Sequence, residues 1–147
     1  GEDKMLVREL MREDAVSVEP TDSVARAARL LYRNNIGALP VCSADHRLRG
    51  VVTDRDIVLR CVAAEINPEE TLVREVMSRN LVTIAPDEDV REACRLMADG
   101  QVRRLPVVDN GKLVGMLSMA DLARSRTYSM EIARALCEIS SNVHRKL

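Results

Sequence analysis

Hydrophobic residues follow helical spacing in some segments of the chain and form short strand-like runs in others. Val7, Leu10 and Met11 lie at positions i, i+3 and i+4 and predict a short lead-in helix. Brief apolar runs that end at proline or polar residues predict strands. The first half therefore predicts a strand at 16–18, a helix with Thr21 as its N-cap that ends near Asn35, hairpin strands at 39–42 and 48–52, and a helix that begins at Thr53.

The second half of the chain shows the same order of patterns. It predicts a strand at 81–84, a helix from Glu88, hairpin strands at 105–108 and 113–117 around the turn 109–111, and a helix from Ser118. Each half thus reads strand, helix, strand, strand, helix. This order predicts an α/β fold.

The two halves are copies of one unit. Pro20 returns as Pro86 and Pro40 as Pro106, and both differences, 86−20 and 106−40, equal 66; thirteen residues between positions 7 and 42 are identical at this offset. Such a match indicates an internal repeat and predicts an approximate two-fold axis. We expect a first repeat at 5–63, a polar linker at 64–71, a second repeat at 72–126 and a C-terminal helical tail at 127–147.

Composition and charge exclude several classes of function. The 147 residues carry 22 basic and 23 acidic side chains, for a net charge of −1, and include no Trp or Phe. A nucleic-acid partner is therefore unlikely on charge and on the lack of stacking platforms. No apolar run approaches the ~18 residues that span a membrane, and no leader peptide is visible, so we expect a cytoplasmic protein without membrane contact.

The cysteines and histidines suggest neither a metal site nor catalysis. The four cysteines, Cys42, Cys61, Cys94 and Cys137, form no close pair, so free and mostly buried thiols are expected. Cys42 and His46 are too few ligands for a metal. No nucleophile, base and orienting group can be assembled, which predicts that the chain is not an enzyme, with no catalytic residues and no catalytic cofactor.

Two motifs that occur in register identify a family resemblance. Leu-Pro-Val appears in both hairpins, and both hairpins end in Gly-x-x-Thr/Ser-x-x-Asp, at Gly50–Asp56 and Gly115–Asp121. With the element order, these motifs resemble a tandem pair of CBS domains, also called a Bateman module, over about residues 5–126. The layout is similar to the small stand-alone CBS-pair proteins of bacteria. The resemblance implies a regulatory, signal-transducing module that binds an adenosine-containing ligand.

The Thr/Ser-x-x-Asp turns have two readings. A hydroxyl residue followed three positions later by an acid forms a capping box at a helix start. The same geometry suits a phosphate at free N–H groups and a ribose diol at the carboxylate. In the resembled family these positions bind phosphate or ribose, which implies ligand-binding roles for Thr53 and Asp56 in one site and for Ser118 and Asp121 in the other.

The residues before each Leu-Pro-Val strand differ between the copies. Arg103 and Arg104 are adjacent cations that can bind phosphate, although a solvated surface pair is the alternative. The first copy has Ile36, Gly37 and Ala38 instead, so a phosphorylated ligand there would need Arg55 or a charge from the other copy. The two clefts should be unequal. Adenine, in this reading, lies near Thr83 and Val102 in one cleft, or Ser17 and Ile36 in the other.

The sequence favours a non-catalytic module that binds an adenosyl ligand, of the AMP, ADP, ATP, S-adenosylmethionine or NAD type, in clefts between the two repeats. A dimerisation or protein-interaction module without ligand, or a regulatory fragment of a larger enzyme or transporter, remains the alternative. We expect a homodimer formed through module helices, with Ile57, Val58 and Cys61 in one copy and Leu122 in the other as apolar faces. The tail stripe of Ile132, Leu136, Ile139 and Val143 either adds to this contact or packs back on its own domain.

Overall fold

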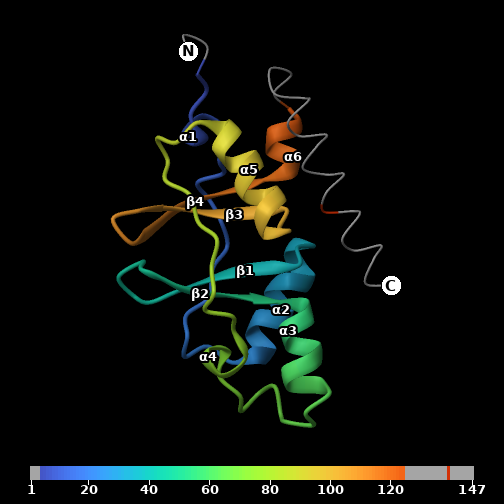
Figure 1. The fold of residues 1–147 in the computed structure, drawn as a ribbon. Helices are drawn as coiled ribbons and strands as arrows, with labels where there is room; N and C mark the ends of the chain where they lie inside the picture. The colour runs from blue at the N-terminus through green and yellow to red at the C-terminus, as the bar shows by residue number, and fades with distance from the viewer. Residues whose placement is uncertain (1–3, 125–138, 140–147) are drawn as a thin grey trace. The chain divides into compact units, whose positions relative to one another are not determined.

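The computed structural model describes residues 4–124 and Ile139. Two antiparallel hairpins, β1–β2 and β3–β4, each form a two-stranded sheet, with short and long helices around them (Figure 1). The elements in chain order are α1 (Val7–Leu10), α2 (Val24–Asn34), β1 (Ala38–Cys42), β2 (Leu48–Thr53), α3 (Asp54–Ile57), the π-helical segment η1 (Val58–Val62), α4 (Val73–Val76), α5 (Val90–Gly100), β3 (Arg104–Asp109), β4 (Lys112–Ser118) and α6 (Met119–Ala123).

The predicted α/β fold is confirmed, with local differences at four places. The expected strands at 16–18 and 81–84 are reduced to single parallel bridges, Val18 with Val41 and Ile84 with Val107. The first long helix begins two residues later than predicted, because the side chain of Ser23 accepts the capping hydrogen bond from the backbone of Arg26, and Asp89 does the same for Arg91 in the second.

The chain folds into two compact units, and the residues of each unit do not coincide with one sequence repeat. The first-repeat unit contains Val16–Leu81 together with Gly111–Leu113. The second-repeat unit contains the described residues up to Ala15, Val82–Asn110, and the described residues from Val114 onward. The N-terminal lead-in helix α1 therefore belongs to the unit that holds β3, and the lead-in helix α4 belongs to the unit that holds β1.

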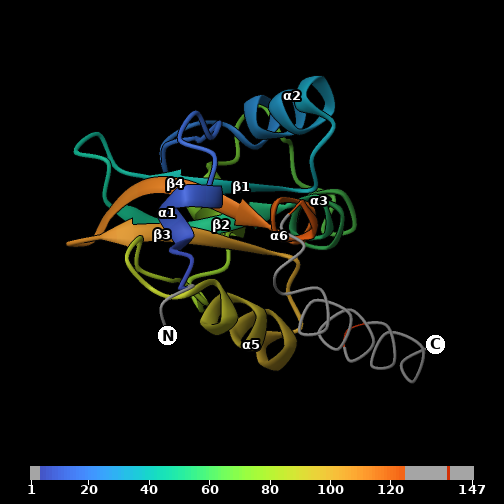
Figure 2. The same ribbon diagram turned by 90° about the horizontal axis from the view of Figure 1, so that it is seen from above.

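In the first-repeat unit, α2 lies along one face of the β1–β2 hairpin (Figure 2). The hairpin register pairs Ala38 with Thr53 and Val41 with Gly50. The start of α4 is fixed by two backbone hydrogen bonds, from Val73 to the carbonyl of Asp22 and from Arg74 to that of Pro20. Its core is aliphatic; the buried side chains from these elements include Val24, Leu31, Leu39, Val52, Cys61, Val73 and Val76.

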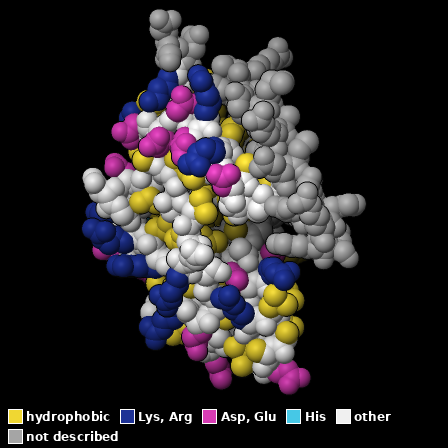
Figure 3. All heavy atoms as spheres, in the orientation of Figure 1, with side chains coloured by type: hydrophobic (Ala, Val, Ile, Leu, Met, Phe, Trp, Pro, Cys, Tyr) yellow, Lys and Arg dark blue, Asp and Glu magenta, His cyan; other side chains and the backbone are white. Residues whose placement is uncertain are grey.

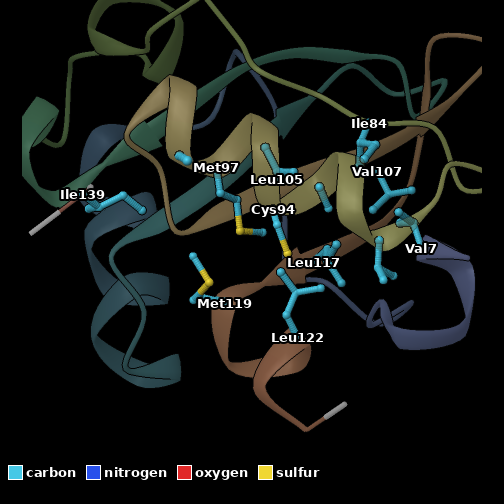
Figure 4. Packing of buried hydrophobic residues seen from close by; sticks show 13 residues of the cluster. Val7, Ile84, Cys94, Met97, Leu105, Val107, Leu117, Met119, Leu122 and Ile139 are labelled. Carbon is cyan, nitrogen blue, oxygen red and sulfur yellow. The ribbon is translucent and has the colours of Figure 1, made fainter. Parts of the chain in front are cut away.

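In the second-repeat unit, α5 lies along one face of the β3–β4 hairpin (Figure 2). Val7 of α1 is fully buried in this core, toward the end with Ile84 and Val107, and Ile139 lies toward the other end (Figure 4). Ile139 is thus the one tail-stripe residue that the structure describes, and it packs on this unit; Ile132, Leu136 and Val143 lie outside the described residues. This contact agrees with a tail that covers its own domain.

The prediction of which apolar side chains are free for a dimer contact is partly wrong. Cys61 is 0% exposed and Leu122 1% exposed, and Ile57 packs against the core of the first-repeat unit, so these side chains are already covered. In the first copy the prediction failed because the helix after Thr53 turns as a π-helix over Val58–Val62, which shifts the outward face. In the second copy Leu122 lies on the α-helix α6 and is buried in the core of the second-repeat unit. Hydrophobic side chains instead gather over α3 and η1 at the lower right of Figure 3. The exposed ones are Val58, Leu59, Val62 and Ile66.

Among residues 4–124, no helix is both long enough and apolar enough to cross a membrane.

Candidate functional site

The first Thr-x-x-Asp turn, at the end of β2, forms a complete capping box. The backbone N–H of Thr53 donates to Asp56 Oδ2 at 2.9 Å, and the backbone N–H of Asp56 donates to Thr53 Oγ1 at 3.0 Å. Asp56 is 9% exposed, and its second carboxylate oxygen, Oδ1, accepts a long hydrogen bond of 3.4 Å from the hydroxyl of Ser78. The carboxylate of Asp56 therefore faces neutral donors only in these contacts.

The second turn, at the end of β4, has the same backbone geometry. Ser118 N–H donates to Asp121 Oδ2 at 2.8 Å, and Asp121 N–H donates to Ser118 Oγ at 3.1 Å. Here the other oxygen, Oδ1, accepts from two guanidinium groups, from Arg12 Nε at 3.2 Å and from Arg124. Asp121 is only 1% exposed, so a carboxylate charge is held inside the protein between two cations.

These contacts control the acidity of Asp121. Burial by itself raises the pKa of the carboxyl group, but the hydrogen bonds from Ser118, Arg12 and Arg124 outweigh burial and hold the pKa of Asp121 below its usual value. Asp121 is therefore a stable carboxylate at neutral pH, with its charge already compensated.

The sequence reading missed the partners of both acids. Arg12 and Ser78 are equivalent positions of the two repeats, since 78−12 equals 66, and each directly follows the repeated Val-Arg-Glu-x-Met segment. A signal was present, because this position changes from a cation to a neutral hydroxyl between the copies. Arg124 has Leu59 as its equivalent, since 124−59 equals 65, so the first copy lacks both cations.

The lead-in segments also explain the glycines of the two motifs. A Cβ atom on Gly50 would lie 2.7 Å from the carbonyl oxygen of Ser78, and one on Gly115 would lie 2.9 Å from that of Arg12. Real Cβ atoms do not approach a backbone oxygen so closely. Glycine at positions 50 and 115 is therefore needed for Ser78 to pair with β2 and for Arg12 to pair with β4. The pairing is a two-way bridge in each copy, Val51 with Ser78 and Met116 with Arg12.

The residues that precede each Leu-Pro-Val strand lie beside the corresponding turn. The carbonyl of Gly37 accepts from Asp54 N–H at 3.0 Å, and the carbonyl of Arg103 accepts from Met119 N–H at 2.8 Å. A Cβ on Gly37 would make only ordinary contact, 3.4 Å from the Asp54 carboxylate. The structure thus brings residues 36–38 to the Thr53 turn and residues 102–104 to the Ser118 turn.

The helix ends that precede these segments use left-handed residues. Asn35 and Gln101 have φ angles of 51° and 56° and close α2 and α5, after which Ile36 and Val102 donate backbone hydrogen bonds to the helix carbonyls of Leu31 and Met97. Ile36, Gly37, Ala38 and Val102 are half-buried, whereas the side chains of Arg103 and Arg104 are exposed. Both arginines therefore face solvent beside the Ser118 turn.

The side chains of the remaining predicted site residues, Ser17, Arg55 and Thr83, make no hydrogen bond to the capping acids within the described residues. Ser17 and Thr83 are exposed and directly precede the bridge residues Val18 and Ile84, which hold them in the same unit as their respective turns. Arg55 is exposed, and its backbone N–H donates to Asp54. No ion pair joins Arg55 to either capping acid in the part of the chain that the structure describes.

Residues 4–124 contain no group of three or more His, Cys, Asp or Glu side chains arranged to hold a metal ion. Cys42 and Cys61 are free, buried thiols, and burial raises the pKa of Cys42. Cys94 is also buried, and Cys137 lies outside the described residues.

Comparison with known proteins defines the family. CBS domains match residues 7–62 and 73–127, so the chain belongs to the CBS domain family and contains two of these domains. CBS domain-containing protein YhcV of Bacillus subtilis is 39% identical over 139 residues, which cover 94% of this chain and 98% of that protein. Hypoxic response protein 1 of Mycobacterium tuberculosis is 34% identical over 117 residues, which cover 80% of this chain and 82% of that protein.

A further relative is longer than the chain. Uncharacterized protein MK0525 of Methanopyrus kandleri is 35% identical over 123 residues, which cover 83% of this chain but 63% of that protein. The chain therefore spans under two-thirds of that relative.

Solved structures of CBS proteins share the fold. Hypoxic Response Protein I with two coordinated zinc ions has a TM-score of 0.75 at 33% identity, covering 82% of this chain and 98% of that one. CBSX2 in complex with AMP has a TM-score of 0.70 at 30% identity, covering 81% and 93%. The CBS domain pair of MJ0100 in complex with 5′-methylthioadenosine and S-adenosyl-L-methionine has a TM-score of 0.70 at 27% identity, covering 82% and 98%.

Proposed function

We propose that this chain is a non-catalytic regulatory module that binds an adenosyl ligand at its two Thr/Ser-x-x-Asp turns. In this proposal Thr53 and Ser118 contact phosphate or ribose, and Asp56 and Asp121 accept the ribose hydroxyls. The observation that carries it is the repeated construction of the turns, each with a buried carboxylate beside the start of the Leu-Pro-Val strand. A carboxylate between backbone donors is a good acceptor for a cis-diol.

The chemistry of the solved relatives supports this ligand class. CBSX2 was solved with AMP, and the MJ0100 pair with 5′-methylthioadenosine and S-adenosyl-L-methionine. These ligands share adenosine and differ in what the 5′ carbon carries, a phosphate in one case and a neutral or cationic sulfur in the others. We therefore assign adenosine recognition to both turns. The charges around each turn would then determine which 5′ group it accepts.

A direct test is thermal unfolding of the full chain with AMP, ADP, ATP, S-adenosylmethionine, 5′-methylthioadenosine and NAD. A ligand at 100 times its Kd adds about 2.7 kcal/mol to stability, which is a shift of several degrees for a chain of this size. Guanosine monophosphate is the matched control for the base. If none of the adenosyl compounds at millimolar concentration raises the midpoint above that control, the proposed function is wrong.

A second candidate function is assembly, and one specific observation favours it. Val58, Leu59, Val62 and Ile66 form an exposed apolar patch on and after η1, with Val58 53% exposed. Exposed apolar side chains that gather in one place mark association surfaces more often than scattered ones do. We infer a homodimer through this patch in a cytoplasmic protein. The relative CBS-CP12, with a TM-score of 0.71 at 26% identity, is hexameric, so assembly occurs among similar proteins.

A further inference from the structure

We propose that Arg12 makes the Ser118–Asp121 turn select adenosyl ligands that carry a 5′-phosphate, whereas Ser78 leaves the Thr53–Asp56 turn suited to adenosyl ligands whose 5′ group is neutral or cationic. This inference rests on the proposed function and names the specificity of each site. It depends on one position of the repeat, which bears a guanidinium in one copy and a hydroxyl in the other.

Both oxygens of the Asp121 carboxylate already accept hydrogen bonds in this structure. Oδ2 accepts from Ser118 N–H, and Oδ1 accepts from both Arg12 and Arg124. A ribose diol that donates to both oxygens of this carboxylate must displace at least one guanidinium, because Oδ1 already accepts two hydrogen bonds. Binding at this turn therefore sets an arginine side chain free beside the ligand.

The guanidinium of Arg12 can move without unfolding its segment. Its backbone is fixed to β4 by two hydrogen bonds, from Arg12 N–H to the Met116 carbonyl at 2.8 Å and from Met116 N–H to the Arg12 carbonyl at 2.9 Å. Its side chain is 64% exposed, so the guanidinium has room to turn about a fixed Cα. Displacement changes side-chain torsions and leaves the pairing with β4 intact.

A displaced guanidinium keeps its charge and needs a new anion. A phosphate provides one, because arginine and phosphate form strong paired hydrogen bonds. A sulfonium group would instead add a positive charge beside Arg12 and Arg124, and a neutral thioether would supply no counter-charge. The cost of opening the Arg12–Asp121 pair is thus offset only by a phosphorylated ligand.

In the first copy a ligand has no arginine–carboxylate pair to open. Ser78 is held on β2 by the equivalent pair of backbone hydrogen bonds to Val51, of 2.8 and 3.0 Å. Its hydroxyl makes only a 3.4 Å contact with Asp56 Oδ1, and within the described residues the donors to the Asp56 carboxylate, this hydroxyl and the backbone N–H of Thr53, are neutral. The negative charge of Asp56 is left for the ligand, which favours a neutral or cationic 5′ group.

The identical backbone at positions 12 and 78 allows a reciprocal exchange as the test. Calorimetric titration of the full chain with AMP and with 5′-methylthioadenosine compares two ligands that differ only at the 5′ group. Arg12→Ser should weaken AMP binding about tenfold, the loss of one charge-assisted contact, and should leave 5′-methylthioadenosine binding unchanged or tighter, because the Arg12–Asp121 pair no longer has to open. Ser78→Arg should lower affinity for 5′-methylthioadenosine at the first turn and raise affinity for AMP there.

Arg8→Ser is the matched control, because it removes the same charge from an exposed position of the same lead-in segment. It should leave both affinities unchanged. If Arg12→Ser weakens both ligands equally, or neither, Arg12 is only a structural contact and the inference is overturned while the proposed function stands. If the parent protein binds no adenosyl ligand, the proposed function and the inference both fail.

Discussion

Arg12 donates a 3.2 Å hydrogen bond from Nε to the carboxylate of Asp121, although 109 positions of sequence separate the two residues. The contact exists because the segment after α1 pairs with β4 rather than with the hairpin that follows it in sequence. The same arrangement brings Ser78, after α4, to Asp56. The capping acid of each repeat is therefore contacted by a residue from the other repeat's lead-in segment.

Asp121→Ala should weaken adenine nucleotide binding by about 1.5–3 kcal/mol, because the ribose loses a charged acceptor. It should also lower the free energy of unfolding, since Arg12 and Arg124 lose their buried partner. Asp121→Asn keeps an acceptor for Ser118 and should restore part of the stability but not of the affinity. Calorimetry and urea unfolding measure the two effects. Reduced stability with unchanged affinity would show that the carboxylate serves only as a cap.

Arg104→Ala should weaken AMP binding more at low salt than at high salt. Arg104 is exposed beside the Ser118 turn, and interactions of exposed charges fade as the Debye length falls to about 10 Å at 0.1 M salt. The measurement is AMP affinity of parent and variant at several salt concentrations. Arg33→Ala, an exposed arginine on α2, is the control. Equal, salt-insensitive binding in parent and Arg104 variant would rule out a phosphate role for this residue.

Stability should fall on acidification, with Asp121 as one contributor. Its pKa is depressed in the folded state, so its stabilising contribution is fully present above the unfolded value of about 4 and is lost as pH falls through the lower folded value. Urea unfolding between pH 6 and pH 3 should show a shallower acid dependence for Asp121→Asn than for the parent. Asp14→Asn, at an exposed acid, should leave the dependence nearly unchanged.

Gly50→Ala and Gly115→Ala should each destabilise the protein by about 1–3 kcal/mol. The added methyl group would meet a backbone oxygen, of Ser78 in one case and of Arg12 in the other, which cannot yield as a flexible side chain does. Gly37→Ala, where the nearest atom is a side-chain oxygen at 3.4 Å, should stay within about 0.5 kcal/mol of the parent. Equal effects at the three positions would mean that the lead-in segments are not held this closely.

The double variant Val58→Glu and Val62→Glu should convert a homodimer into monomers, because both side chains belong to the exposed patch of η1. Light scattering at tens of micromolar reports the mass. Tyr32→Glu changes an exposed residue on α2 and is the control. Removal of residues 128–147 should leave the dimer intact if the patch forms the interface. A parent protein that is monomeric at this concentration would refute the assembly proposal.

The sequence was sufficient for the two hairpins and for the capping geometry, but the strands predicted at 16–18 and 81–84 are only single bridges. Repeated patterns placed both hairpins within a residue or so of their observed ends, and the spacing of Thr53 and Asp56 implied the capping box that the structure contains. It was not sufficient for Arg12, because no local pattern indicates that a lead-in segment pairs with a strand about 100 residues later. It also misplaced the outward face after Thr53, because helical spacing assumes 3.6 residues per turn and η1 is wider.

Because α1 belongs to the second-repeat unit, the two units complete their folding in a fixed order during synthesis. Nearly all of the first-repeat unit, Val16–Leu81, leaves the ribosome as one continuous stretch that can fold as soon as it is complete. Val7 is made earlier than all of it, yet its buried neighbours Leu117 and Leu122 are made only after it is complete. The segment around Val7 must therefore wait for residues on the far side of the first-repeat unit before it gains its partners, and it folds after the unit that follows it in sequence.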